Sequence, residues 1–559
     1  MKMYEKFVYA IINSRFNKFA VIIITLLVLL GSVLMIAPTK IVLVKMLPGK
    51  SANTYSAYVD LPSGSSIEQT KKVGKCVVNI LKKEKEVTDI EGYYGDGAPL
   101  DYAGLVKGSG FKNSENVAEF VVNLTDKHER EERSYEMVHR IRPIIKKSCE
   151  KLVKGTVIKM IEQPAGPPTL AAIVTEIYGQ NLSSIRKLSK RVANILKNTK
   201  GLVDIDIMDD DVYTKYNVLP NIDKIQKSGL SVEQVQKILY LAFEGMGVGV
   251  KNSENYPTQI ELFIRLSDKT RRFNTSSLKD VKSKLATFEL MNQKGMMVPL
   301  SEVVDIVKSI NKQTITHKNL RRYINVIAEA DEVSQVYPLL DAREKMMKEL
   351  SKYYDIKEDS IKNFTHMFDL HLTDKKTGEK LDIVWDGEMK VTLDTFRDLG
   401  LAFIAALVMI YFLMVIYYKS YSISSIIMAG SFLSIIGVIV GHWVADLVTK
   451  DTFFLTSTSL IGFIALMGIS SRNSLLLVDF AKALIEEKGI EKKRAIAVAT
   501  ATRAKPIVLT AIAIILGSAL LASDPIFGGL GVALIGGTVA AVAVSLIFIP
   551  VLMDNTKAI

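Results

Sequence analysis

The distribution of apolar residues constrains this chain more than any other feature. One apolar run lies near the N-terminus, at residues 19–36, and a long polar stretch follows it up to residue 398. Five further apolar runs crowd into the remainder, at residues 399–417, 423–445, 453–478, 507–522 and 530–553. A helix of about 20 apolar residues is long enough to cross a bilayer. The sequence therefore predicts six transmembrane helices, one before the polar region and five after it.

The composition agrees with a chain divided between lipid and water. Of its 559 residues 48% are hydrophobic, yet 23% are charged, and the mean hydropathy is +0.21. A soluble protein rarely combines these values. The length allows several domains, so a membrane part and a large water-exposed part fit into one chain.

Basic residues beside the apolar runs predict the orientation of the helices. Arg15 and Lys18 precede the first run, Lys419 lies in one short connection, and Arg494 and Lys505 lie in or beside the longest one. All of them fall on the same side if the helices alternate in direction. The positive-inside rule assigns that side to the cytoplasm. Both termini are then expected in the cytoplasm and the large polar region outside it.

The spread of charge and the lack of enzyme motifs disfavour several classes of function. The net charge is +12, but the basic residues are spread along the chain and mixed with acidic ones, so we expect no nucleic acid as a partner. The six histidines form no HExxH motif, and neither a Walker A motif nor a nucleophile elbow occurs. We therefore expect no enzyme, no catalytic residue and no cofactor.

Metal binding by soft ligands is not expected either. The methionines of the polar region are scattered, and the spacing of the only two cysteines, Cys76 and Cys149, fits no metal motif. A disulfide between these cysteines is permitted outside the cytoplasm. Two semi-buried thiols are the favoured interpretation.

The polar region shows a repeated β-α-β pattern. Strand-like alternation at residues 55–61 and 117–124 flanks helical spacing at residues 67–81, and a helix is expected at residues 135–145. A second set follows, with strands at residues 172–178 and 202–207 around a helix at 182–196. This set resumes with a strand at 298–307, a strand at 323–328 and a helix at 337–350. The pattern predicts tandem α/β sandwiches with an insertion at residues 212–297.

Sequence runs along the whole chain resemble a known family of transporters. The most specific run is STSLIGFIALMGISSRNSLLLVDF (residues 457–480), followed by RAKPIVLTAIAIILG (503–517) and DPIFGGLGVALIGG (524–537). Supporting runs, in family order, are YVDLPSGSSIEQT (58–70), VNLTDKHERE (122–131), AGPP (165–168) and WDGEMKVTLDTFRDLG (385–400). Together they resemble the C-terminal half of a resistance-nodulation-division (RND) efflux transporter permease subunit of the acriflavine-resistance type.

The resemblance implies a fold class and a domain organisation. The expected fold is an α+β polytopic membrane protein, with six transmembrane helices (1+5) and tandem β-α-β periplasmic porter subdomains that carry an inserted docking subdomain. The implied boundaries, in chain order, are residues 1–38 for a cytoplasmic leader and the first helix, 39–168 for the first porter subdomain, 169–211 with 298–397 for the second, 212–297 for the docking or funnel subdomain, and 398–559 for the five-helix bundle.

The resemblance also implies a proton relay inside the membrane. Arg472 occupies the place of the basic residue of the relay, which is usually a lysine and acts as counter-ion to two aspartates on a helix of the first half. A charge within a span costs roughly 3 kcal/mol and normally needs an interior partner. Because the run around Arg472 is apolar on both sides, we expect a buried position rather than one at a helix end. Arginine keeps its charge, which suits a fixed counter-ion.

Three further residues match the relay, each with a structural alternative. Thr510 matches its hydroxyl, or it hydrogen-bonds to its own helix backbone. Arg503 matches a basic residue at the cytoplasmic mouth, or it is a positive-inside anchor. Asn473 orients the cluster, or it bridges two helices.

Other polar residues have structural interpretations. Asp479 is expected to form an interfacial ion pair with Lys482, and His442 to be an aromatic-belt residue near the periplasmic surface. The glycine-rich and tyrosine-rich stretch at residues 92–110 is expected to be a surface loop.

The expected function is proton-coupled efflux of small amphiphilic compounds across the inner membrane, as the second half of an RND pump with a large periplasmic domain. The aspartate-bearing helix belongs to the other half, so we expect this chain to need a first-half RND polypeptide as a separate partner, or else to be a truncated or split product of a longer pump. The resemblance further implies a trimeric pump in membrane lipid, a periplasmic adaptor protein and an outer-membrane channel. The alternative is a non-transporting membrane accessory factor or sensor, similar to half-size relatives that aid secretion.

Overall fold

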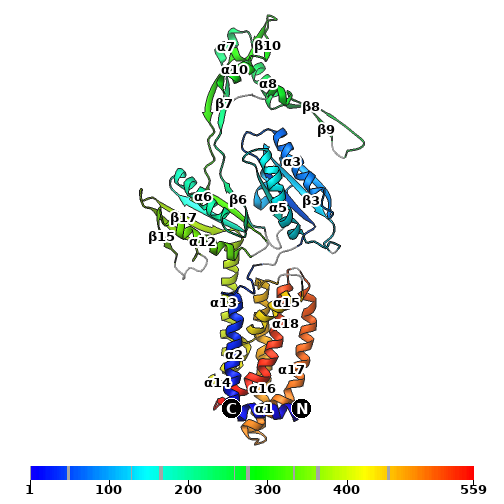
Figure 1. Ribbon diagram of the computed structural model, residues 1–559, viewed down its shortest axis with the longest axis vertical. Helices are drawn as coiled ribbons and strands as arrows, with labels where there is room; N and C mark the ends of the chain where they lie inside the picture. Colours follow the sequence, from blue (N-terminus) through cyan, green and yellow to red (C-terminus); the bar gives the residue numbers. More distant parts are fainter. Residues whose placement is uncertain are drawn as a thin grey trace.

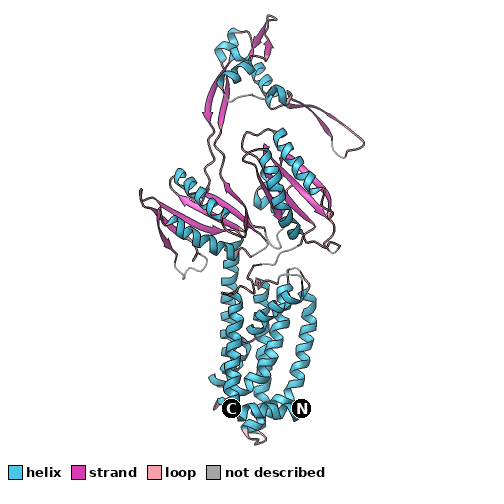
Figure 2. Cartoon of the chain, in the orientation of Figure 1, coloured by secondary structure: helices cyan, strands magenta, loops and turns pink. Residues whose placement is uncertain are grey.

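The computed structural model describes residues 2–46, 51–127, 129–162, 168–256, 259–271, 277–331, 334–359, 366–449, 453–524 and 526–558. Parts of the runs AGPP and DPIFGG therefore lie outside the described residues. The molecule is elongated (Figure 1): a helical bundle forms one end, two α/β units lie above it, and a smaller unit forms the far end. In the part of the chain that the structure describes, the bundle is built of helices, and the strands lie above it (Figure 2).

The α/β unit nearest the N-terminus, here called the first unit, is a four-stranded sheet with two long helices on one face. The strand order is β2-β3-β1-β4, and all pairs are antiparallel. Its elements are β1 (Thr54–Asp60), α3 (Ile67–Leu81), β2 (Val87–Asp96), α4 (Tyr102–Lys107), β3 (Asn113–Leu124), α5 (Ser134–Cys149) and β4 (Val157–Glu162). Tyr55 and Phe120 are fully buried beneath α3 and α5.

A disulfide joins Cys76 of α3 to Cys149 at the end of α5. The favoured interpretation of two separate thiols is therefore wrong. Cys149 is fully buried in the core of the first unit and the half-buried Cys76 packs against that core, so the two side chains meet where α3 and α5 contact each other.

The other α/β unit, here called the second unit, is a seven-stranded sheet assembled from two separate stretches of chain. The order is β13-β14-β5-β17-β16-β15, and β6 also pairs with β14. The first stretch supplies β5 (Ile173–Gly179), α6 (Leu182–Lys197) and β6 (Leu202–Met208). The second supplies β13 (His317–Lys318), β14 (Arg321–Ala330), α12 (Val336–Leu350), β15 (Tyr354–Glu358), β16 (Leu370–Asp374) and β17 (Lys380–Asp386). Helices α6 and α12 bury the apolar face of the sheet.

The far unit is inserted between those two stretches on a two-stranded antiparallel ribbon, β7 with β12. Its elements are β7 (Thr214–Pro220), α7 (Ile222–Lys227), α8 (Val232–Phe243), β8 (Met246–Lys251), β9 (Ile260–Ile264), α9 (Asp268–Arg271), α10 (Leu278–Leu285), β10 (Glu289–Met291), β11 (Met297–Pro299), α11 (Leu300–Val303) and β12 (Val304–Ile310). The single strand expected at residues 298–307 is therefore wrong, because a short helix divides it.

Within the described residues, the helical bundle contains six helices that are long and apolar enough to cross a membrane: Arg15–Ile36, Glu388–Tyr418, Tyr421–Val448, Ser457–Glu486, Lys492–Ala522 and Gly528–Asn555. The elements are α1 (Lys2–Asn13), α2 (Arg15–Ile36), α13 (Glu388–Tyr418), α14 (Tyr421–Phe432), α15 (Ile435–Val448), α16 (Ser457–Glu486), α17 (Lys492–Ala522), α18 (Gly528–Ala543) and α19 (Ile549–Asn555). The expectation of a mixed helix and sheet protein with several apolar helices is confirmed. Both termini lie at the end of the bundle that points away from the α/β units (Figure 1).

Two differences from the sequence-based expectations concern element boundaries. Helix α13 begins at Glu388, directly after β17, so the helix continues from the sheet into the bundle. The stretch expected to be a surface loop at residues 92–110 contains the end of β2 and all of α4. Tyr94 packs edge-on against Phe120 at 5.4 Å between ring centroids, so this part of β2 belongs to the sheet core.

Candidate functional site

Helix α16 carries the first group of candidate residues. It begins at a capping box in which Thr456 and Ser459 satisfy the free amide groups of the first turn. One face of α16 packs against α14, α17 and α18. The opposite face is exposed in a single line at helical spacing, formed by Ile461, Ala465, Gly468, Arg472 and Leu476. These five residues are called the outer stripe below.

Arg472 lies in the middle of α16 and belongs to the outer stripe. In the chain by itself the Arg472 side chain is exposed, because the inner face of α16 is already occupied by its own bundle. The alternative of a snorkelling position at a helix end does not agree with the structure, since α16 runs from Ser457 to Glu486. Arg472 thus presents a fixed positive charge on the outside of an apolar helix.

The other three relay candidates lie apart from the Arg472 guanidinium. Asn473 is buried on the inner side of α16. The Thr510 hydroxyl donates to the Pro506 carbonyl at 2.9 Å, as in its structural alternative. Arg503 stacks over the Phe480 ring at 5.1 Å, which ties α17 to α16. Within the described part of the chain no hydrogen bond or ion pair links these residues to one another.

Two polar residues of the bundle take positions that differ from those expected. The Tyr418 hydroxyl donates to Asp479 at 2.6 Å, while Lys482 lies 3.6 Å from Glu486, so the expected pair of Asp479 with Lys482 is wrong. His442 is fully buried rather than in an aromatic belt: its Nδ1 contacts the Val438 carbonyl and its Nε2 the Ser459 hydroxyl, both at 2.8 Å.

A cleft between the two α/β units is the second candidate site. Its volume is about 530 Å³, and its lining comes from β1 and β4 of the first unit and from β6 and the end of β14 of the second. Apolar and charged side chains share the lining, among them Tyr58, Ile161, Ile207, Asp60 and Lys159. Such a mixed cleft suits ligands that have both an apolar body and a polar group.

Ion pairs cross this cleft from one unit to the other. The Lys159 ammonium lies 3.1 Å from Asp60 of its own unit and 2.6 Å from Asp206 of the second unit. Lys107 of the first unit pairs with Glu329 at 2.8 Å. Burial alone would lower the pKa of Lys159, but the Asp60 and Asp206 carboxylates raise it above its usual range.

Sequence reasoning missed these charged residues, although a signal for them exists. Lys159 interrupts the apolar strand VIKMIE, and Asp204 and Asp206 interrupt the apolar strand LVDIDIM. Burying a charge in a strand requires a partner. A charged residue inside an otherwise apolar strand therefore indicates a contact with another unit.

Comparison with known proteins places the chain in a family. The model of the AcrB/AcrD/AcrF family matches residues 1–368 and 370–554. The swarming motility protein SwrC of Bacillus subtilis (strain 168) is 24% identical over 387 residues, which make up 68% of this chain and 32% of SwrC.

Two crystal forms of a heavy metal efflux pump share the fold. One has a TM-score of 0.71 at 18% identity, covering 100% of this chain and 51% of the pump. The other has a TM-score of 0.69 at 17% identity, covering 99% and 51%. The chain thus spans about half the length of these pumps and about a third of SwrC. By the match of the family model along nearly its whole length, the chain belongs to the AcrB/AcrD/AcrF family of RND permeases.

Proposed function

We propose that this chain is the second half of a proton-coupled RND pump that exports small amphiphilic compounds across the inner membrane. Membership of an efflux permease family and the shared fold of efflux pumps support this proposal. The observation that carries it is Arg472, a charge in the middle of the outer stripe of an apolar helix.

The six apolar helices cross the membrane with both termini in the cytoplasm. The basic residues beside the helices support this orientation. The two α/β units are then the periplasmic porter subdomains, and the far unit is the docking subdomain. The disulfide between α3 and α5 supports an oxidising compartment for the first unit.

The outer stripe of α16 is the face that receives the first half of the pump. An arginine facing lipid at mid-membrane is costly, so Arg472 needs a carboxylate from outside this chain. Gly468 and Ala465, one and two turns before Arg472, are small enough for a second helix to approach closely. In the assembled pump Arg472 is the counter-ion of paired aspartates, and Thr510 and Arg503 of α17 contribute to the relay. Asn473, buried on the inner side of α16, acts on the relay only through the packing of that helix.

Transport follows from coupling the membrane helices to the cleft. Substrate enters the cleft between the porter subdomains, and a change in protonation next to Arg472 moves α16 relative to the first half. A trimer of such pumps, a periplasmic adaptor and an outer-membrane channel complete the export route.

Drug susceptibility in a pump-deficient Gram-negative host tests the proposal. The chain is expressed alone, with a first-half polypeptide of the same family from the same genome, and as that pair with Arg472→Ala. A matched control is Lys488→Ala, which removes an exposed charge in the connection after α16. We expect resistance from the intact pair and from the Lys488→Ala pair only, at equal membrane levels.

Two outcomes contradict the proposal. Full resistance from the chain alone would remove the need for a first half. Resistance that persists in the Arg472→Ala pair would remove the role of the charge. An absence of resistance in every combination would favour the non-transporting accessory factor.

A further inference from the structure

The edges of the two α/β sheets meet at one border of the cleft. Strand β4 is the edge strand of the first sheet, and β6 of the second sheet lies in contact with it. The pairing of β6 with β14 is interrupted by a bulge between Ile327 and Glu329, and opposite this bulge Asp204 has a φ of 53°. Aspartate tolerates this left-handed conformation better than most residues. A bulge re-aims a side chain, and here the Asp204 carboxylate points at the first unit.

The Asp204 carboxylate is completely buried among groups of the first unit. Its Oδ2 accepts from the Met160 amide at 3.1 Å and lies 3.3 Å from Arg142 Nε, while its Oδ1 lies 2.6 Å from Lys146 Nζ. The Asp204 side chain is 0% exposed and that of Arg142 is 6% exposed. Asp204 therefore depends on the first unit for every charge that compensates it among the described residues.

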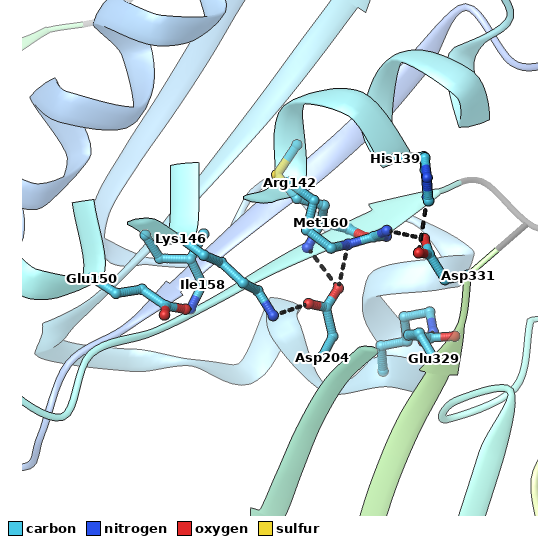
Figure 3. A network of polar contacts seen from close by, with 10 residues as sticks. His139, Arg142, Lys146, Glu150, Ile158, Met160, Asp204, Glu329 and Asp331 are labelled. Atoms are coloured by element: carbon cyan, nitrogen blue, oxygen red, sulfur yellow. Dashed lines mark hydrogen bonds and ion pairs between the residues drawn. The ribbon is translucent and has the colours of Figure 1, made fainter. Parts of the chain in front are cut away.

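Asp331, which follows β14 directly, contacts helix α5 at a second position. Its Oδ1 lies 2.6 Å from Arg142 Nη1, and its Oδ2 lies 2.8 Å from His139 Nδ1. Arg142 thus lies between two carboxylates of the second unit, as Figure 3 shows, and it also donates to the Met160 carbonyl at 3.3 Å.

The charges of this cluster are divided strictly between the two units. The basic groups, Arg142, Lys146 and the imidazole of His139, which is charged only when protonated, all come from α5, and the carboxylates Asp204 and Asp331 both come from the second unit. An apolar contact would hold the units together at many relative positions. A buried ion pair instead demands one geometry and becomes unfavourable when one partner is left behind.

We propose that this cluster is a latch that holds the porter cleft in its closed arrangement and must release before the cleft can widen. The inference rests on the proposed function, in which substrate passes through this cleft. Asp204 lines the cleft itself, so α5 cannot move away from β6 without exposing the cluster to water. Water then solvates the basic groups of α5 and the carboxylates of the second unit, which makes the open arrangement of the cleft accessible. Because the buried ion pairs demand one geometry, the cleft opens in one abrupt step and does not widen gradually.

The distance between the two units tests the latch without any transport assay. The full chain in lipid nanodiscs carries spin labels at Lys72→Cys on α3 and Asn194→Cys on α6, two exposed positions. The native disulfide does not react with thiol-specific labels. Double electron–electron resonance then gives the distribution of distances between the first and second units.

Two variants weaken the latch by removing one of its charges, and one control leaves it intact. Arg142→Ala removes the shared cation, and Asp331→Asn removes one carboxylate whose side chain is 20% exposed, so the second variant folds even if the first does not. The control is Arg140→Ala on the same helix, because Arg140 pairs with Glu84 and Glu132 of its own unit at 2.6 and 2.7 Å.

We expect both latch variants to broaden the distribution and to move its mean to longer distance, with no change in the control. An unchanged distribution in Asp331→Asn, or an equal change in Arg140→Ala, would overturn the latch. The distances are measured without substrate, so this experiment and the transport assay are independent. Unchanged distances would refute the latch even if the pump exports, and an absence of export would refute the proposed function even if the distances change.

Discussion

The contact between α15 and α18 yields a prediction that can be worked out from the backbone. Gly437 of α15 and Gly536 of α18 pack against each other without side chains. A Cβ atom at Gly536 would lie 2.3 Å from the Gly437 carbonyl oxygen and 2.8 Å from the Gly441 Cα. These obstacles are backbone atoms, so a methyl group fits only if the two helices move apart.

The size of the effect follows from two opposing terms. Alanine gains about 1 kcal/mol over glycine in a helix interior. Overpacking costs typically 1–3 kcal/mol, and obstruction by backbone places Gly536→Ala at the upper end, so we expect a net loss of about 2 kcal/mol. The control is Gly517→Ala on α17, where a Cβ atom would meet nothing within 4 Å. The control is therefore expected to gain up to about 1 kcal/mol.

Thermal unfolding of the purified full chain in detergent, followed by size-exclusion chromatography, measures the difference. Gly536→Ala should lose its monodisperse peak several degrees below the wild type, and Gly517→Ala at or slightly above it. Equal midpoints for the two variants would refute the reasoning, because the close approach of α15 and α18 would then not exist in the protein.

Three further predictions concern stability. Cys149→Ser opens a disulfide that spans 73 residues and should destabilise the first unit by up to about 4 kcal/mol; a melting midpoint equal to that of the wild type would contradict it. Burial raises the pKa of the Glu162 carboxyl to about 7, so folding favours its protonated form. Glu162→Gln should therefore stabilise the protein by an amount that grows from about pH 4 to pH 7 and stays constant above pH 7. At that plateau the gain in the free energy of unfolding should be on the order of 3 kcal/mol. A pH-independent difference between melting curves would exclude this. Tyr418→Phe removes the bond to Asp479 and should cost about 1.5–3 kcal/mol, whereas the exposed neighbour variant Tyr417→Phe should be neutral; equal melting points would argue against the bond.

The helices and many strands could be predicted because the apolar residues in each of them recur at one regular spacing. The apolar positions of α3 and α6 recur at helical spacing, and both helices occupy the expected residues. Strand β2 was missed because its glycines and tyrosines resemble a loop, and only packing against Phe120 makes it a core strand. Local composition does not contain that contact.

Of the candidate sites, too, one part could be predicted from the sequence and another part could not. The sequence identifies Arg472 as a charge in an apolar helix, but the side on which it lies depends on which face of α16 the neighbouring helices occupy. The latch could not be predicted, since Asp204 and Arg142 are 62 residues apart in sequence (204 − 142) and meet only through a bulge and the contact of two sheets. The resemblance names the family, whereas these contacts depend on the tertiary structure.

Photo-crosslinking from the outer stripe tests the central claim most directly. A photoreactive amino acid replaces Ala465, and the chain is irradiated in cells with and without the co-expressed first-half polypeptide. We predict an adduct whose mass equals this chain plus the first half, present only when both are expressed. Adducts with lipid alone, in cells that contain both polypeptides, would contradict the account that α16 faces the other half of the pump.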